Sequence, residues 1–196
     1  MIREVEVKKQ KAFRETAIED AIIAHPDKLE FPEALAIRNF RLADTSGAVD
    51  VVLLPRPDSS FKLVLVEAKA ASAQDAGSKV VGQLLMYYAG ALKLGLDGIC
   101  ALEKFARASP TVAHSIPRIS PQKVMGGLGS NAQCFEALKM GDRLTQKDIA
   151  LFIALDNEPR HTLVPTLNIL RELHGLHIGL VLVRSGSIDL VLPAAG

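Results

Sequence analysis

The sequence predicts an α/β fold in which a mixed sheet is flanked by helices. Two apolar runs joined by a turn, in VDVVLLPRPDSSFKLVLVEAK at residues 49–69, have the composition of two paired strands. Late in the chain, a strand, a helix and two more strands follow one another, which is typical of a sheet with helices on its faces. Apolar residues at helical spacing near the start of the chain add a further covering element.

The first half of the chain is expected to contain two helices and three strands. The first helix should end near His25, because Pro26 disfavours the helical region for the residue before it. ALAIRNFRLA, residues 34–43, alternates loosely and predicts a strand ahead of the hairpin. After the hairpin, SKVVGQLLMYYAGALKLG predicts a helix that stops at Gly95.

The second half begins with a region that is harder to interpret. Residues of about 100–147 are expected to be an insertion or an irregular region, because Pro and Gly recur too often for long regular elements. Within it, AQCFEALKMG has the composition of a short helix. DIALFIAL then predicts a buried strand, HTLVPTLNILRELHGL a helix, and HIGLVLVRSGSIDLVLP two strands that turn at Ser185-Gly186.

Length and composition predict a single globular domain over residues 1–196. The hydrophobic fraction of 48% suits a sizeable core, and charges interrupt every apolar stretch well short of the ~20 residues that a membrane span requires. The start MIREVEVKKQK lacks the apolar region of a signal peptide, and two cysteines are too few for a disulfide scaffold. A cytoplasmic protein is therefore expected, and its net charge of +1 neither demands nor excludes a polyanionic partner.

Three charged residues stand out because strand interiors rarely hold charges. If the hairpin pairs Pro55 with Lys62, Asp50 falls opposite Glu67 at a Cβ separation of about 5 Å. Alternation places Glu67 and Lys69 on one face of the sheet, and a strand bulge would change this arrangement.

Two carboxylates this close repel each other by roughly 4 kcal/mol at an effective dielectric constant near 20, so a cation must compensate them. Lys69 is one candidate and a divalent metal ion is the other. Oxygen ligands without His or Cys favour Mg²⁺ or Mn²⁺ over zinc. The alternative is an exposed salt-bridge cluster at the end of a strand, with little consequence for stability or function.

This arrangement resembles the PD-(D/E)XK nuclease superfamily, whose signature is an acidic residue on one hairpin strand and E-x-K on the next. Asp50 in GAVDVV and Glu67-Ala68-Lys69 in VLVEAKA are similar to that signature. As in the NucS-type and RecB-like nuclease domains, a glutamate (Glu19) precedes the hairpin in AIEDAIIAHPDKLE, and a glutamine (Gln83) follows it in VGQLLMYYAGAL. The resemblance covers residues 13–95 and implies a restriction-endonuclease-like fold with an α-β-β-β-α-β core and C-terminal additions.

The resemblance also implies a mechanism. It assigns Mg²⁺ or Mn²⁺ to Asp50, Glu67 and the backbone carbonyl of Ala68, and the orientation or deprotonation of the attacking water to Lys69. Glu19 would bind the metal directly, through water, or hold a second ion, and the Gln83 amide would orient the water or a ligand. The catalytic set is therefore Glu19, Asp50, Glu67, Lys69 and Gln83.

The function implied is metal-dependent hydrolysis of DNA phosphodiester bonds in repair, restriction or processing. The alternative on the same fold is a non-catalytic module that binds nucleic acid or protein. A third alternative is an interaction protein whose apolar surface mediates association, and a homodimer is compatible with each of these. Sequence alone leaves open the form of the DNA, or RNA, that would be bound.

Overall fold

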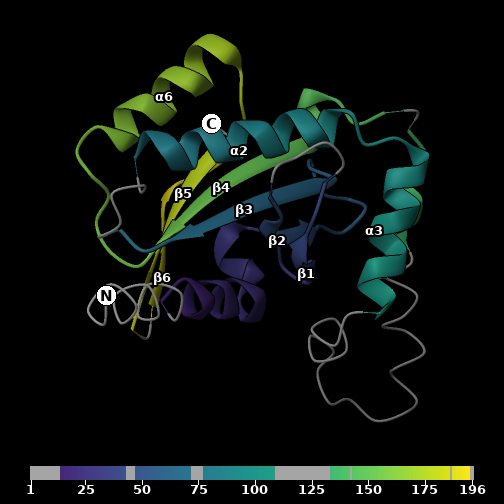
Figure 1. The fold of residues 1–196 in the computed structure, drawn as a ribbon, viewed down its shortest axis with the longest axis horizontal. Helices are drawn as coiled ribbons and strands as arrows, with labels where there is room; N and C mark the ends of the chain where they lie inside the picture. Colours follow the sequence, from purple (N-terminus) through teal and green to yellow (C-terminus); the bar gives the residue numbers. More distant parts are fainter. Residues whose placement is uncertain are drawn as a thin grey trace, which may run out of the picture.

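The structure is a computed structural model that describes residues 14–42, 47–71, 77–108, 133–141, 143–185 and 187–194. A twisted sheet forms the centre of the molecule, with α2 (Ser78–Leu92) and α6 (Leu163–His174) along one face. A helix at residues 14–24, drawn in purple in Figure 1, covers the opposite face together with the short 3-10 helix η1 (Pro26–Leu29). The fold is therefore an α/β arrangement with helices on both sides of the sheet.

The sheet contains six strands in the order in which they occur along the chain. Neighbouring strands are antiparallel from β1 to β3, parallel from β3 to β5, and antiparallel again between β5 and β6. The strands are β1 (Leu35–Phe40), β2 (Val49–Leu54), β3 (Leu63–Lys69), β4 (Ile149–Leu155), β5 (Ile178–Arg184) and β6 (Ser187–Leu192). The predicted mixed sheet is confirmed.

Each face of the sheet has its own hydrophobic core, and β3 contributes to both by alternation. Leu63 and Leu65 belong to the cluster that packs under α2, α3 (Leu96–Ala108) and α6. Val64, Val66 and Ala68 belong to the cluster on the face covered by the 14–24 helix. Side chains of a strand point alternately to opposite faces, so Glu67 and Lys69 continue the series that faces α2.

Most of the elements expected from the sequence are present. The first helix ends before Pro26, as predicted, and the hairpin pairs in the predicted register, with Val51 opposite Val66 and Leu53 opposite Val64. Gly175 ends α6 with a φ of 63°, the left-handed conformation in which glycine is favoured. The segment at residues 1–13 and Gly186 of the expected turn lie outside the described residues.

The expectation of an irregular region at about residues 100–147 was wrong at its start, whereas the short helix expected within it is present. Helix α3 extends to Ala108, and a short helix occupies residues 133–139, where AQCFEALKMG predicted one. Residues 109–132 lie outside the described part. Helix α2 ends at Leu92 and α3 begins at Leu96, so the break at Gly95 separates two helices where the sequence predicted a single helix and then irregular chain.

Within the described ranges, no single helix is long and apolar enough to cross a membrane. One pair, Lys79–Leu92 with Leu96–Ala108, meets the length and composition criterion only when both helices are counted together, and it is bent by 113°.

Candidate functional site

The carboxylate of Asp50 lies where the pairing of β2 with β3 ends. The last recorded pair of that ladder is Val51 with Val66. Beyond it, the backbone N–H of Ala68 donates a hydrogen bond of 2.8 Å to Asp50 Oδ2. A side-chain oxygen thus takes the place of the next main-chain acceptor, so the Asp50 carboxylate lies close to the plane of the sheet.

The chain is irregular on the other side of Asp50 as well. Strand β1 pairs with β2 at Arg38–Val51 and at Phe40–Val49, but no pair is recorded between them, at the row of Asn39 and Asp50. Asn39 has a φ of 55°, a left-handed conformation that asparagine adopts more readily than most residues. Val49 and Val51, on either side of Asp50, belong to the cores on opposite faces of the sheet, so the alternation of side chains is broken at Asp50.

Glu67 is the only charged side chain among the buried residues of the described chain, with 1% of its surface exposed. Its Oε1 lies 2.7 Å from Lys69 Nζ, and its Oε2 has no hydrogen-bond partner among the described residues. Burial, and then the charge of Asp50, raise the pKa of Glu67 from 4.5 to about 7, although Lys69 lowers it. The carboxylate is therefore poised between its two protonation states near neutral pH.

Lys69 supplies positive charge between the two strand carboxylates. Its Nζ lies 2.7 Å from Glu67 Oε1 and 4.0 Å from Asp50 Oδ2. Burial disfavours the charged amine, but Glu67, Asp50 and Glu15 outweigh it and raise the pKa of Lys69. Three of the residues predicted from the hairpin thus converge, as the register requires.

Glu19 reaches the same cluster from the 14–24 helix. Its pKa is raised from 4.5 to about 7, first by burial and then by the neighbouring Asp50 carboxylate, while Arg38 lowers it. Arg38 Nε lies 3.3 Å from Glu19 Oε2, and the Arg38 guanidinium also pairs with Asp20. Glu19 therefore lies between Asp50 and a cation that the hairpin motif does not include.

Gln83 has only an indirect connection to the carboxylates. Its recorded contact is a hydrogen bond with the Tyr87 side chain, one turn further along α2. Tyr87 is buried, and its hydroxyl donates a 2.8 Å hydrogen bond to the carbonyl oxygen of Ala48, two residues before Asp50. Burial, then the charges of Glu67 and Asp50, raise the pKa of Tyr87 to about 12.

Several residues beside the site were not assigned to it from the sequence. Tyr87 is buried, and its hydroxyl also fixes the chain ahead of Asp50. Glu15 lies one helical turn before Glu19 and accepts a long hydrogen bond of 3.5 Å from the Ala70 N–H. The spacing of four residues between Glu15 and Glu19 is the sequence signal that places both on one helix face.

Asp156 was also missed, because its proximity depends on parallel pairing. Lys69 and Leu155 are in register at the ends of β3 and β4. Asp156 follows immediately, and its Oδ1 accepts a 2.7 Å hydrogen bond from the Ala71 N–H. Asp156 thus secures the chain just after Lys69, a role that can be found only once β4 is known to lie beside β3.

The donor set is compatible with a hard divalent cation. In the described part of the chain, no group of three or more His, Cys, Asp or Glu side chains is arranged to hold a metal ion. Mg²⁺, however, is commonly held by one or two carboxylates and keeps several waters. Asp50 and Glu67 supply two such carboxylates, and the buried Oε2 of Glu67 has no hydrogen-bond partner among the described residues.

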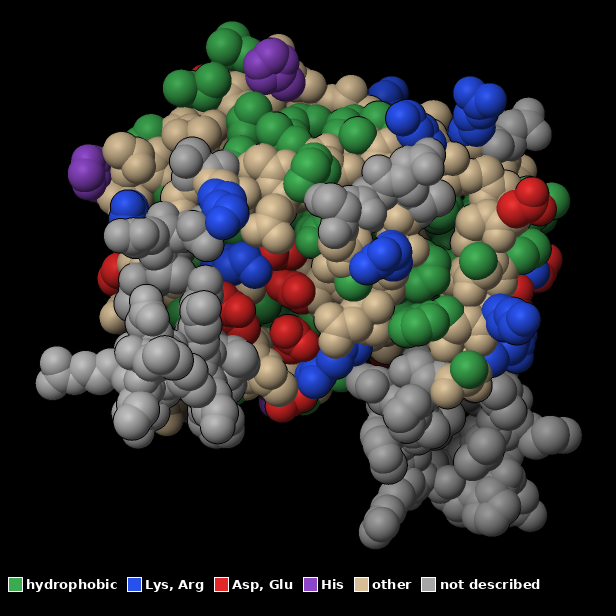
Figure 2. Space-filling view, viewed as in Figure 1, with side chains coloured by type: hydrophobic (Ala, Val, Ile, Leu, Met, Phe, Trp, Pro, Cys, Tyr) green, Lys and Arg blue, Asp and Glu red, His purple; other side chains and the backbone are tan. Residues whose placement is uncertain are grey.

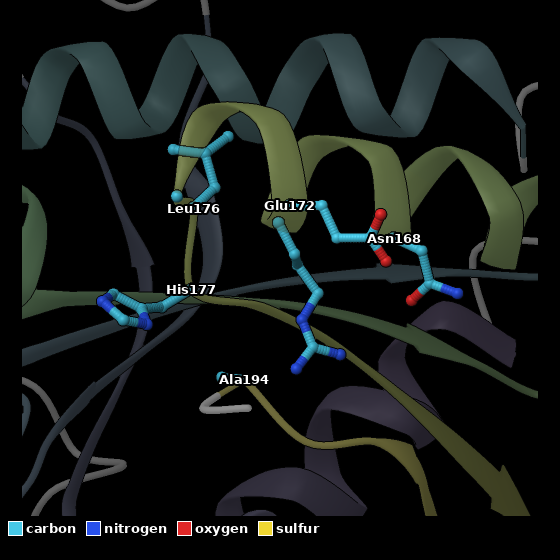
Figure 3. A pocket seen from close by; sticks show the side chains of 7 residues that line it. Asn168, Glu172, Leu176, His177 and Ala194 are labelled. Carbon is cyan, nitrogen blue, oxygen red and sulfur yellow. The ribbon is translucent and has the colours of Figure 1, made fainter.

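A surface pocket of about 390 Å³ lies elsewhere, between α6, the start of β5 and the chain after β6 (Figure 3). Asn168, Arg171, Glu172 and His177 line it, and the His177 ring packs edge-on against Phe61 at 5.0 Å between ring centroids. His177 directly precedes β5, whereas Glu67 and Lys69 end the parallel strand β3, so the pocket is at the opposite end of the strands. With a single carboxylate in its lining, it offers no comparable cation site.

The space-filling view shows acidic side chains gathered beside basic ones near the middle of one face (Figure 2).

No family model matches the chain, and no match was found among curated proteins or solved structures. The cluster formed by Asp50, Glu67, Lys69 and Glu19 is therefore the feature of the described chain that bears on function.

Proposed function

We propose that the protein is a metal-dependent nuclease that hydrolyses phosphodiester bonds of DNA. The observation that carries this proposal is the buried Glu67 carboxylate, which keeps one oxygen without a partner directly beside Asp50 and Lys69. A buried charge of this kind lowers stability unless a ligand or a reaction makes use of it. Two carboxylates and an ammonium group at one end of the interior strands β2 and β3 are suited to phosphate chemistry.

The order of the elements supports a restriction-endonuclease-like fold for this proposal. A helix at residues 14–24, strands β1 to β3, helix α2 and strand β4 give the order α-β-β-β-α-β, with α3 and the helix at residues 133–139 inserted between α2 and β4. The same order accompanies the Asp50 and Glu67-Ala68-Lys69 signature in the PD-(D/E)XK resemblance. Strands β5 and β6 would then be the C-terminal additions.

The proposed cation is Mg²⁺ or Mn²⁺, held by Asp50, Glu67 and the carbonyl oxygen of Ala68. Bound there, it would offset the negative charge of the phosphate and lower the pKa of a water molecule. The Ala68 N–H already fixes Asp50 Oδ2, so the orientation of this carboxylate does not depend on the cation. Such preorganisation reduces the reorganisation needed when substrate binds.

Lys69 is the residue proposed to act on the attacking water. Glu67 and Asp50 keep its amine protonated, so that it can donate hydrogen bonds to the water and to a phosphate oxygen that gains charge. Gln83 would support the site through Tyr87, whose hydroxyl holds the backbone at Ala48. The carboxylate of Asp50 is thereby anchored from both β3 and α2.

A cleavage assay with matched variants tests the proposal. Labelled duplex and single-stranded oligonucleotides and plasmid DNA are incubated with Mg²⁺ or Mn²⁺ and wild type, Asp50→Asn, Lys69→Met or Lys62→Met. Asp50→Asn and Lys69→Met should each lose cleavage by about 100-fold or more. Lys62, which pairs with Asp148 just before the start of β3, is the control and should be dispensable.

The outcomes separate the alternatives. Undiminished cleavage by both Asp50→Asn and Lys69→Met would refute the assignment of the site. Wild-type protein that binds the DNA but cleaves none of these substrates would instead favour a non-catalytic binding module. Circular dichroism and thermal unfolding of each variant establish that a loss of cleavage is not a loss of fold.

A further inference from the structure

A phosphate group entering this site meets a surplus of negative charge. Asp50 lies close to both Glu19 and Glu67, and Glu15 is close enough to influence the pKa values of both Glu19 and Lys69. At a separation of 4 Å, each further pair of like charges costs about 4 kcal/mol at an effective dielectric constant of 20. Lys69 pairs with Glu67, so a further positive charge beside the cluster would help it to receive the DNA backbone.

Arg38 is placed to be that cation. It lies on β1, in register with Val51 and thus next to Asp50 on the neighbouring strand. Its side chain is 23% exposed, so it is reachable from solvent although it is largely covered. Its charge also acts directly on the pKa of Glu19, which in turn feels the Asp50 charge.

The contacts of Arg38 leave part of its guanidinium available. Nε lies 3.3 Å from Glu19 Oε2 without a hydrogen bond of ordinary geometry, and Nη2 pairs with Asp20. In the described part of the chain, Nη1 makes no hydrogen bond and no ion pair. One edge of the guanidinium is thus held by two carboxylates, and the other can present donors to a phosphate oxygen.

We propose that Arg38 contacts a backbone phosphate of the DNA, and that Glu19 acts by positioning Arg38 and not as a metal ligand. This inference rests on the proposed nuclease function and assigns to Glu19 a role different from the one that the family resemblance implies. The geometry favours it because the recorded partner of the Glu19 carboxylate is the Arg38 guanidinium. A carboxylate that holds an arginine in this way preorganises it for a bidentate or forked contact.

Arg56 offers a matched control. Like Arg38, it pairs with two carboxylates, Glu33 and Asp58, each at 3.3 Å. It lies in the connection between β2 and β3, just beyond Leu54, whereas Asp50 is near the other end of β2. Removing its charge changes the protein's net charge by the same amount without touching the carboxylate cluster.

Two binding measurements test the inference. Fluorescence anisotropy with labelled duplex and single-stranded 30-mers in Ca²⁺ gives DNA affinity over a range of salt concentrations, and gels after each titration exclude cleaved samples. Calorimetry with Mn²⁺ alone gives metal affinity without any need for activity. The variants are Arg38→Gln, Arg38→Lys, Arg56→Gln, Glu19→Gln and Asp50→Asn, each with its thermal unfolding recorded.

Arg38→Gln should weaken DNA binding roughly tenfold and reduce the salt slope by about 1, while Arg56→Gln leaves both values near those of wild type. Arg38→Lys keeps the positive charge but loses the forked guanidinium, so its DNA affinity should fall about threefold. If Arg38→Gln does not fold, Arg38→Lys tests the inference in its place. Glu19→Gln should also weaken DNA binding, with Mn²⁺ affinity unchanged within about twofold, whereas Asp50→Asn should lose Mn²⁺ binding.

The inference is overturned if the Arg38 variants bind DNA like Arg56→Gln, or if Glu19→Gln loses Mn²⁺ as severely as Asp50→Asn does. Either result leaves the nuclease proposal intact, because wild type would still bind metal through Asp50. Wild-type protein that binds neither Mn²⁺ nor DNA would instead refute the proposed function and this inference together.

Discussion

Lys69 Nζ lies 2.7 Å from Glu67 Oε1, and the two residues are separated on β3 by Ala68 alone. Their side chains therefore share the face of the sheet that α2 covers. The ion pair does not neutralise the local charge, because Asp50 contributes a second carboxylate and the pKa of Glu67 is still raised to about 7. A group this far from its ordinary pKa makes the stability of the protein depend on pH.

Glu67→Gln should make the protein more resistant to unfolding at alkaline pH. The folded-state pKa of about 7 exceeds the ordinary value of 4.5, so between these values the folded state binds more protons than the unfolded state. The stability that the raised pKa of wild-type Glu67 contributes to the folded state is thus fully present below about pH 4.5 and is lost as the pH rises through about 7. Relative to wild type, the free energy of unfolding of Glu67→Gln should increase by about 1–3 kcal/mol between about pH 5 and pH 8, as measured by urea unfolding.

Glu136→Gln is the control for this experiment. Glu136 is an exposed carboxylate that pairs with Lys139 at 2.9 Å, outside the cluster. Its variant should follow the wild-type pH profile. Parallel profiles for wild type and Glu67→Gln would mean that Glu67 is not held in the buried environment described here.

Metal affinity should fall as the pH falls through about 7. A carboxylate must lose its proton before it can bind a cation, and Glu67, which is a proposed metal ligand, has a pKa raised to about 7. Below about pH 7, the apparent metal affinity should fall about tenfold per pH unit for each proton that the metal ion must displace. Calorimetry with Mn²⁺ in two buffers of different ionisation enthalpy measures the protons released, and an affinity that is constant from pH 6 to pH 8 would contradict the prediction.

The hairpin was the part of the site that the sequence could predict, because it depends on local rules alone. Two apolar runs, a turn-forming connection and strict alternation determine which residues of β2 and β3 face each other, and the recorded pairs have the expected register. The position of Asp50 relative to the faces was not predictable. Asp50 lies beside Asn39 of a different strand, and the loosely alternating pattern does not reveal the left-handed backbone of Asn39.

The contacts of Arg38 and Asp156 were beyond sequence reasoning for another reason. Both depend on how elements distant in the sequence are brought together: the 14–24 helix against β1, and β4 beside β3. Helix α3 was missed because Gly95 and Gly98 interrupt the apolar pattern at its start. The structure nonetheless buries Ile99, Leu102 and Ala106 along one side of that helix.

Tyr87→Phe should lower stability by about 1–2 kcal/mol, because the partly buried Ala48 carbonyl loses the hydroxyl that donates to it. If the hydroxyl also holds Asp50 in place, cleavage should decrease several-fold under conditions in which the variant is fully folded. Tyr88→Phe is the matched control, because the neighbouring ring is only partly buried. Equal unfolding midpoints for the two variants would show that the Tyr87 hydroxyl does not secure the start of β2.

Gly179→Ala should destabilise the sheet that supports the site, while Gly82→Ala should stabilise the protein. A Cβ atom at Gly179 in β5 would lie 2.5 Å from Phe152 Cε1 and 2.7 Å from the Leu192 carbonyl oxygen, and backbone cannot yield as a flexible side chain can. The expected cost is about 2–3 kcal/mol. At Gly82 in α2 no heavy atom lies within 4 Å of the added Cβ, so the higher helix propensity of alanine should add about 0.5–1 kcal/mol. Chemical unfolding of both variants measures the difference, and a Gly179→Ala protein as stable as wild type would show that β4, β5 and β6 do not pack as closely as described.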